Sequence, residues 1–300
     1  MTTKTRAEIV LLATTLIWGG TFAVNKIALA EVSPLLFITI RFVIATAFFL
    51  AFFSRRIFPL PRAALVQGGL LGLFLFLGFA TQTIGLQYTT ASKSAFITGT
   101  MVIFVPVVQV LVEKRAPKLG NIAGIVIVVM GLWLLTAPEG STFNMGDGLN
   151  LICAVFFALY IVHLDVVSQR MTALRLTFLQ TASMTLFAGL SAWAFEDFAF
   201  TPSRNVLLSL AYLTGFATIL TLFVQTRFQK DTTPTRAVVI FSIEPVIAAV
   251  IAAILLGERL GPEGVLGGAL IVGGVLLSEL SDAIPGLNRS IAKFDTGPSA

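Results

Sequence analysis

Apolar residues along the chain gather in long runs that short polar segments separate. A helix needs about 20 mostly apolar residues to cross a bilayer, whereas a membrane β-barrel shows alternating segments of about 10 residues. These runs are too long, and too apolar on every side, for a barrel. They are Ile9–Leu29, Leu35–Phe53, Ala63–Leu86, Ala95–Val112, Ile122–Ala137, Leu149–Val167, Leu174–Phe195, Val206–Val224, Ala237–Leu256 and Val265–Leu280. The pattern predicts an all-α integral membrane protein with ten transmembrane helices.

Composition supports this prediction. Of the 300 residues, 56% are hydrophobic and only 12% are charged, about half the charged share of a soluble domain. The single cysteine, Cys153, excludes an intramolecular disulfide. Lys4 and Arg6 before the first run resemble the start of a signal peptide, but the run is long and Asn25 and Lys26 interrupt its far half. We therefore expect a retained helix.

Basic residues are distributed unequally between the loops. If the amino terminus is cytoplasmic, 15 lysine and arginine residues lie in inner segments, and only Lys26, Lys93, Arg204 and Arg259 lie in outer ones. This bias predicts that both termini are cytoplasmic and that the chain lies in the cytoplasmic (inner or plasma) membrane. It also accounts for the basic pI of about 9.7 without a nucleic-acid partner.

Weak internal similarity divides the chain into two halves. Gly124 and Gly131 match Gly267 and Gly274 with the same spacing. We expect a first five-helix repeat at 1–137, an external linker at 138–147, a second repeat at 148–282 and a flexible cytoplasmic tail at 283–300. Five is odd, so the second repeat would be inverted relative to the first. Inverted repeats are typical of alternating-access transporters, with a substrate site at the midplane, although a channel can also be built this way.

Several short motifs in this order resemble EamA-type members of the drug/metabolite transporter (DMT) superfamily, over about residues 7–282. The motifs are Trp18-Gly19-Gly20-Thr21-Phe22, Ser33-Pro34, Arg41-Phe42, Glu244-Pro245 and Leu256-Gly257-Glu258-Arg259-Leu260. The resemblance implies a ten-helix secondary transporter. Many such proteins export amino acids and related metabolites, and the YddG-like aromatic amino-acid exporters are among them. The first half has Val105-Pro106 where the second has Glu244-Pro245, so an acidic role there is not duplicated.

Polar and aromatic side chains inside the spans indicate where a substrate would bind, because such groups avoid lipid and face the protein interior. Helical spacing places several of them on shared faces. A threonine or serine can instead bond to a carbonyl of its own helix. The candidate substrate-binding residues are Trp18, Thr21, Arg41, Phe79, Gln82, Thr98, Met101, Phe157, Tyr160, Gln225 and Ser242.

Three ionisable residues inside the spans have more than one interpretation. Arg41 can be tied to backbone carbonyls at a helix interface, or can bind a substrate carboxylate with its guanidinium. Glu244 can be protonated, paired with Arg41 at a similar depth, or a proton carrier. His163, the only histidine, is either a packing residue or a gating group. We take Glu244 and His163 as the candidates for coupling or gating.

These features favour a secondary transporter that exports small neutral or zwitterionic metabolites, best matched by amino acids with aromatic or hydrophobic side chains. A passive channel and multidrug-type efflux of hydrophobic compounds remain alternatives. Hydrolase and metalloprotease motifs are missing from the sequence, as is a nucleotide-binding Walker A loop, so we expect no enzyme, no cofactor and no metal site. The expected partners are a small-molecule substrate and the lipid bilayer. Small-residue pairs such as Gly68–Gly72 suit internal packing, with a monomer or weak dimer as the assembly.

Overall fold

The computed structural model describes residues 2–114, 116–136, 143–259, 261–281, 284 and 286–290. In these residues the regular elements are helices, and the only extended pairs are two isolated bridges. In chain order the helices are α1 (Thr3–Gly19), α2 (Thr21–Ala28), α3 (Pro34–Ile57), α4 (Arg62–Tyr88), α5 (Ala91–Gly99), α6 (Met101–Glu113), α7 (Leu119–Thr136), α8 (Met145–Ser168), α9 (Ala173–Phe195), α10 (Arg204–Thr214), η1 (Gly215–Leu220), α11 (Thr221–Phe228), η2 (Gln229–Asp231), α12 (Pro234–Phe241), α13 (Glu244–Leu256) and α14 (Pro262–Leu280). The all-helical fold class is therefore confirmed.

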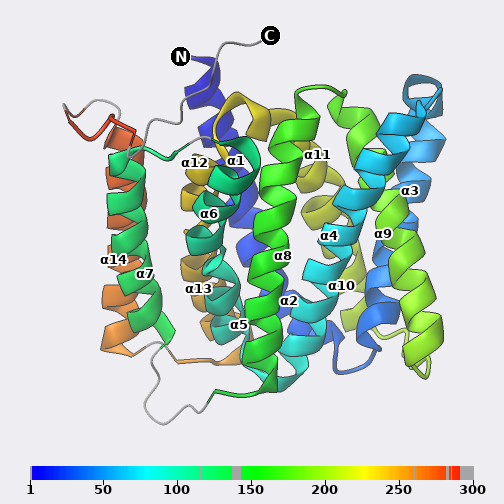
Figure 1. Ribbon diagram of the computed structural model, residues 1–300. Helices are drawn as coiled ribbons and strands as arrows, with labels where there is room; N and C mark the ends of the chain where they lie inside the picture. The colour runs from blue at the N-terminus through cyan, green and yellow to red at the C-terminus, as the bar shows by residue number, and fades with distance from the viewer. Residues whose placement is uncertain are drawn as a thin grey trace.

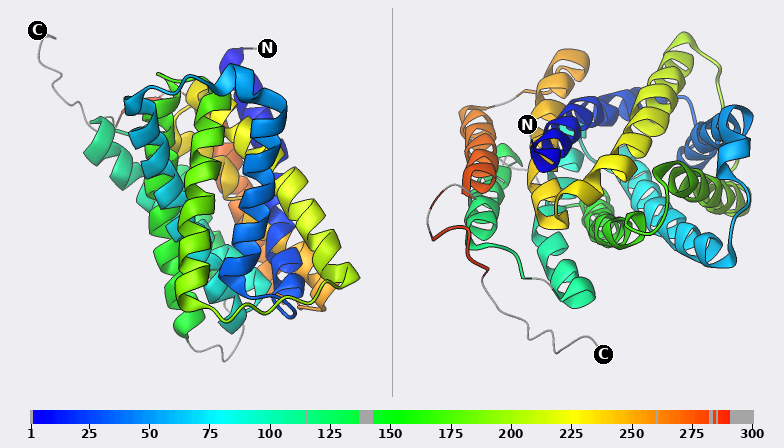
Figure 2. Two further views of the ribbon diagram at one scale, coloured as in Figure 1. Left: turned by 90° about the vertical axis from the view of Figure 1, so that its right-hand side faces the viewer. Right: turned by 90° about the horizontal axis from the view of Figure 1, so that it is seen from above.

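The helices run up and down between two ends of the molecule (Figure 1). The end where α1 begins and α14 finishes is called the amino-terminal end here, and the opposite one the far end. Seen from the amino-terminal end, the α7–α14 pair lies to one side of the other helices (Figure 2). Residues 137–142 of the predicted linker, and most of the predicted tail at 283–300, lie outside the described residues.

Length and composition identify a multi-pass membrane protein. Within the described residues, seven helical stretches are long and apolar enough to cross a bilayer, and Leu119–Leu134 and Pro262–Ser278 are shorter apolar helices. The span predicted at Leu174–Phe195 forms α9, which has the length but carries Gln180 and several threonines. Ten crossings and an inverted pair of repeats stay predictions.

Three of the long stretches are broken near their middle, and a fourth is widened there. The breaks are at Gly20 between α1 and α2, at Thr100 between α5 and α6, and at Ser242–Ile243 between α12 and α13. The widened part is η1, a π-helix between α10 and α11. A π-helix is rare and often accompanies a functional site.

Glycines allow the broken helices and the α7–α14 pair to approach closely. A Cβ on Gly99 would lie 2.8 Å from Cγ of Pro245, so two of the breaks pack against each other. A Cβ on Gly124 would lie 2.6 Å from the carbonyl oxygen of Gly274, and one on Gly274 would lie 2.7 Å from that of Gly124. Each glycine of the first half therefore meets a glycine of the second half that is not its sequence match: Gly124 meets Gly274, and Gly131 meets Gly267.

The start of α8 differs from the predicted boundary. The predicted second repeat starts at residue 148, but α8 begins at Met145. The Asn144 side chain accepts a hydrogen bond from the Asp147 amide, and the Asp147 carboxylate accepts one from the Asn144 amide. This capping box satisfies the free amides of the first turn, so the helix begins inside the predicted linker.

Candidate functional site

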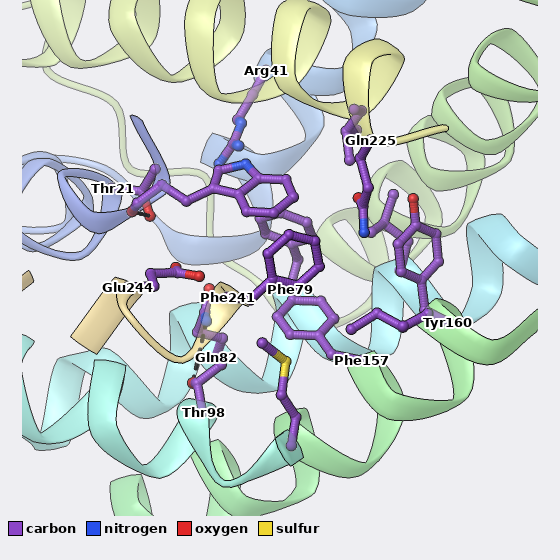
Figure 3. Close-up of a pocket in the computed structure, with 15 residues that line it drawn as sticks. Thr21, Arg41, Phe79, Gln82, Thr98, Phe157, Tyr160, Gln225, Phe241 and Glu244 are labelled. Carbon is purple, nitrogen blue, oxygen red and sulfur yellow. Dashed lines mark hydrogen bonds between the residues drawn. The ribbon is translucent and has the colours of Figure 1, made fainter. Parts of the chain in front are cut away.

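A cavity lies where the helix breaks meet (Figure 3). Its walls are mostly apolar and aromatic, with a few polar and two ionisable groups. The lining residues are Trp18, Thr21, Arg41, Leu75, Phe79, Gln82, Thr98, Met101, Phe157, Tyr160, Ile161, Leu222, Gln225, Phe241 and Glu244.

The structure brings most of the sequence-predicted residues together around this cavity. Ten of the eleven candidate substrate-binding residues line it, and so does Glu244. Ser242 is buried at the end of α12, where its hydroxyl donates to the Val238 carbonyl 2.9 Å away. His163 is not among the lining residues; its ring packs edge-on against Phe74, with the ring centroids 6.0 Å apart. The binding and gating roles themselves stay predictions.

Each helix discontinuity places lining residues on its two sides. Trp18 and Thr21 flank the break between α1 and α2, and Thr98 and Met101 flank the one between α5 and α6. Residues freed from regular helical bonding offer polar backbone groups to a cavity, as in many transporters. The positions of the breaks therefore explain why polar and aromatic groups from distant parts of the sequence converge here.

Aromatic rings form a connected wall. The Trp18 and Phe241 ring centroids are 5.4 Å apart, and those of Phe79 and Phe157 are 5.5 Å apart, both edge to face. The Arg41 guanidinium carbon lies 5.0 Å from the Phe79 ring centroid, within cation–π range. A planar apolar group in the cavity would meet rings on several sides.

Arg41 is buried, with 2% of its surface exposed, and it bonds to η1 rather than to Glu244. Its Nη2 donates to the Ala217 carbonyl at 3.1 Å, and its Nε donates to the Thr218 hydroxyl. Among the described residues there is no ion pair between Arg41 and Glu244, so the pairing considered from their depths is wrong. The Ala217 carbonyl of the π-helix binds the guanidinium instead. The depth of a residue along its helix does not predict such a partner.

Glu244 lies in the first turn of α13, and in Figure 3 its carboxyl group points toward the cavity. No hydrogen bond or ion pair to the Glu244 side chain is found within the described residues. The cavity therefore holds a guanidinium and a carboxyl group that do not neutralise each other.

Toward the amino-terminal end, buried neutral side chains join α8, α9 and α11. Tyr160 donates to Gln180 at 3.0 Å, and the Gln180 amide donates to the Thr226 hydroxyl at 3.1 Å. Gln225 donates to Gln229 at 2.9 Å, and the Gln229 amide donates to the Ile161 carbonyl at 2.7 Å. We call Tyr160, Gln180, Gln225, Thr226 and Gln229 the amide network.

Toward the far end, charged groups make the connections. The Lys26 ammonium donates to the carbonyls of Leu86 and Thr89, at 2.6 and 2.7 Å. Lys93 and the fully buried Asp147 form an ion pair of 2.6 Å, and the Glu258 carboxylate accepts from the first two amides of α5. We call Lys26, Thr89, Lys93, Asp147 and Glu258 the far-end clamp.

Four lining residues are not among the sequence candidates: Leu75, Ile161, Leu222 and Phe241. They carry no polar group, so a search for polar faces passes over them. Spacing contains a partial signal, because Leu75 lies one turn before Phe79 and Leu222 lies three residues before Gln225. Neither spacing distinguishes a residue that lines a cavity from one that packs in the core.

The described residues contain no group of three or more histidine, cysteine, aspartate or glutamate side chains that could hold a metal ion. The arrangement instead suits reversible binding. It offers aromatic surface, hydrogen-bonding groups such as Gln82 and Thr98, whose side chains are 3.3 Å apart, and one ionisable group of each sign.

Comparison with known proteins gives the chain a family. The model of the EamA-like transporter family matches it twice, over residues 5–137 and 144–280. An uncharacterized transporter of Archaeoglobus fulgidus is 35% identical over 274 residues, covering 91% of this chain and 86% of the relative. Protein PagO of Salmonella typhimurium is 25% identical over 95% of this chain and 97% of its own length.

Two further comparisons agree. The uncharacterized inner membrane transporter YedA of Escherichia coli is 28% identical over 84% of this chain and 82% of the relative. A solved crystal structure superposes with a TM-score of 0.75 at 17% identity, covering 92% of this chain and 97% of the other, which shows a shared fold. The chain is a multi-pass membrane protein and belongs to the EamA-like transporter family of the DMT superfamily.

Proposed function

We propose that this transporter exports small neutral or zwitterionic metabolites, chiefly amino acids with aromatic or hydrophobic side chains. The observation that carries the proposal is the central cavity, in which Arg41 and Glu244 are present without pairing with each other. A zwitterionic amino acid carries one negative group for Arg41 and one positive group for Glu244. Its carboxylate would accept from Arg41, whose Nη1 makes no hydrogen bond within the described residues. Its ammonium would lie near Glu244, and its side chain against the rings.

Transport would proceed by alternating access between two inverted five-helix repeats. The chain would cross the cytoplasmic membrane ten times, with both termini in the cytoplasm. Three findings support this: the double family match, the reciprocal glycine contacts between α7 and α14, and the basic residues in the loops of the amino-terminal end. We place the coupling role on Glu244, which would exchange a proton for the substrate ammonium, and leave His163 as a second candidate.

The decisive experiment is flux in liposomes that contain the purified protein. We expect phenylalanine counterflow above that of empty liposomes, at least a tenfold loss in Arg41→Gln and Glu244→Gln, and little change in Thr46→Val, a control on α3 whose hydroxyl contacts Thr185 away from the cavity. A pH gradient should drive uptake in the parent and not in Glu244→Gln. Absence of flux for a broad amino-acid panel would overturn the proposal.

A second candidate is efflux of hydrophobic cations, favoured by a carboxyl group beside aromatic rings. The same assay separates the two by comparing phenylalanine with phenylethylamine, which has the ammonium and no carboxylate. Preference for phenylalanine that Arg41→Gln abolishes supports amino-acid export. Equal transport of phenylethylamine, unaffected by Arg41→Gln, supports cation efflux.

A further inference from the structure

The π-helix η1 is bonded by residues that belong to the cavity. The Ala217 carbonyl accepts from Arg41 Nη2 at 3.1 Å and from Trp18 Nε1 at 3.4 Å. The Thr218 hydroxyl accepts from Arg41 Nε and itself donates to the Leu213 carbonyl, five residues back, at 2.8 Å. Two side chains from α1 and α3 therefore bond to backbone and hydroxyl groups of the widened turn.

These bonds explain why the widened turn persists. A π-helix accommodates one residue more than an α-helix and leaves part of its backbone bonding irregular. Buried carbonyls need donors, and Arg41 and Trp18 supply them. Trp18 also donates to Thr221 at 2.9 Å, the first residue after the turn. Removing these donors favours a regular α-helix in the same segment.

Helix α11, which comes directly after the widened turn, closes the cavity on one side. Leu222 and Gln225 line the cavity, and Thr226 and Gln225 belong to the amide network. One residue of an α-helix turns by about 100°. A change from π to α geometry therefore rotates α11 by about that angle, and takes Thr226 away from Gln180 on α9.

We propose that Arg41 and Trp18 act as positioning residues that hold η1 in its π form, and that a carboxylate bound to Arg41 in the cavity releases it. The competing carboxylate draws the Arg41 donors away from Ala217 and Thr218. The segment becomes α-helical, α11 rotates, and the amide network at the amino-terminal end separates. This inference goes beyond the proposed function, because variants can test it without any substrate.

The test uses spin-label distances in the full chain, with Cys153→Ala as background. One label pair, at Arg170 and Arg227, joins the end of α8 to α11; a reference pair, at Arg62 and Arg170, leaves α11 out. Arg62, Arg170 and Arg227 are all exposed. Given a helix radius of about 5–6 Å with side chains, a rotation by 100° displaces a label by about 8 Å. Without ligand, Arg41→Gln and Thr218→Val should each shift the first pair by several ångströms and leave the reference pair unchanged.

The matched control is Thr46→Val on α3, which should shift neither pair. Phenylacetate added to the parent should reproduce the shift, and phenylethylamine, which lacks a carboxylate, should not. Folded Arg41→Gln and Thr218→Val proteins with parental distances would overturn the positioning role; if one variant fails to fold, the other decides. Shifts in the variants without a phenylacetate response would overturn the carboxylate trigger alone. Failure of transport leaves these distances unaffected, so the two proposals fail separately.

Discussion

Different chemistry holds the helices together at the two ends of the cavity. At the far end the clamp uses an ion pair, a lysine that bonds to two carbonyls, and a carboxylate that caps α5. At the amino-terminal end the amide network uses hydrogen bonds between neutral side chains and one carbonyl. Arg236 and Glu8 form an ion pair of 2.8 Å at this second end, but they join α1 to α12 and not to α8, α9 or α11.

This difference in bonding indicates which end of the cavity should open first. A neutral hydrogen bond contributes about 0.5–1.5 kcal/mol, and one to a charged group about 1.5–3 kcal/mol. Separation of the amide network also leaves no unpaired charge in the interior, whereas separation of Lys93 from Asp147 does. The amino-terminal end therefore opens at lower free energy. If it faces the cytoplasm, as we propose, an empty transporter loads from inside, which fits export.

Removal of the buried carboxylate should have the largest effect. Asp147→Ala removes one member of the ion pair and an acceptor of the capping box, so we expect a loss of about 3–5 kcal/mol in the free energy of unfolding. Thermal melting of the purified protein measures it. Asp231→Ala breaks an exposed pair with Arg227 and should cost about 0.5 kcal/mol or less. Equal melting temperatures for the two variants would contradict the strength assigned to the clamp.

An intermediate effect is expected at the other end. Gln180→Leu leaves the Tyr160 hydroxyl and the Thr226 hydroxyl without this partner, which should cost about 1–3 kcal/mol. It should also open the cavity toward the amino-terminal end. The only cysteine, Cys153, is fully buried with its sulfur 4.0 Å from the Thr98 hydroxyl. Its labelling by a small maleimide applied from that side should therefore become faster.

The matched control is Gln67→Leu on α4. Its buried Oε1 accepts no hydrogen bond within the described residues, so the substitution should leave both stability and Cys153 labelling near the parental values. If Gln180→Leu and Gln67→Leu label at the same rate, the amide network does not close this end.

The long helices, and the faces that carry their polar groups, could be predicted from the sequence. Trp18, Gln82 and Gln225 lie on different helices, yet each could be singled out because a polar or amphipathic group inside an apolar run must face protein. This local rule needs no knowledge of the neighbours. The structure gathers these residues around one cavity for the same reason.

The rule fails where a feature depends on distant residues. The partners of Arg41 lie 176 and 177 positions further along the chain. The sequence around them does not predict the π-helix to which they belong. Spacing alone predicts a regular α-helical face through Thr218, Thr221 and Gln225, whereas η1 occupies the start of that stretch. Ser242 resembles a cavity residue in the sequence, but its hydroxyl donates to the Val238 carbonyl one turn back, and spacing alone cannot separate these two uses of a serine.

The smallest and most selective change keeps one acceptor oxygen at the far end and removes a charge. Glu258→Gln keeps an acceptor for the amides of Ala91 and Ser92 and weakens the favourable charge at the start of α5, by about 0.5–1 kcal/mol. Glu196→Gln is its match, because Glu196 accepts from the Leu35 and Leu36 amides at the start of α3. The two variants should lose similar stability.

They should differ in access to the cavity. Glu258 joins the segment after α13 to α5, which carries the lining residue Thr98, whereas Glu196 joins the segment after α9 to α3. Only Glu258→Gln should therefore speed labelling of Cys153 from the far side. Faster labelling in both variants, or in neither, would mean that charge at the far end stabilises the helices without closing the cavity. The two ends would then differ in stability alone.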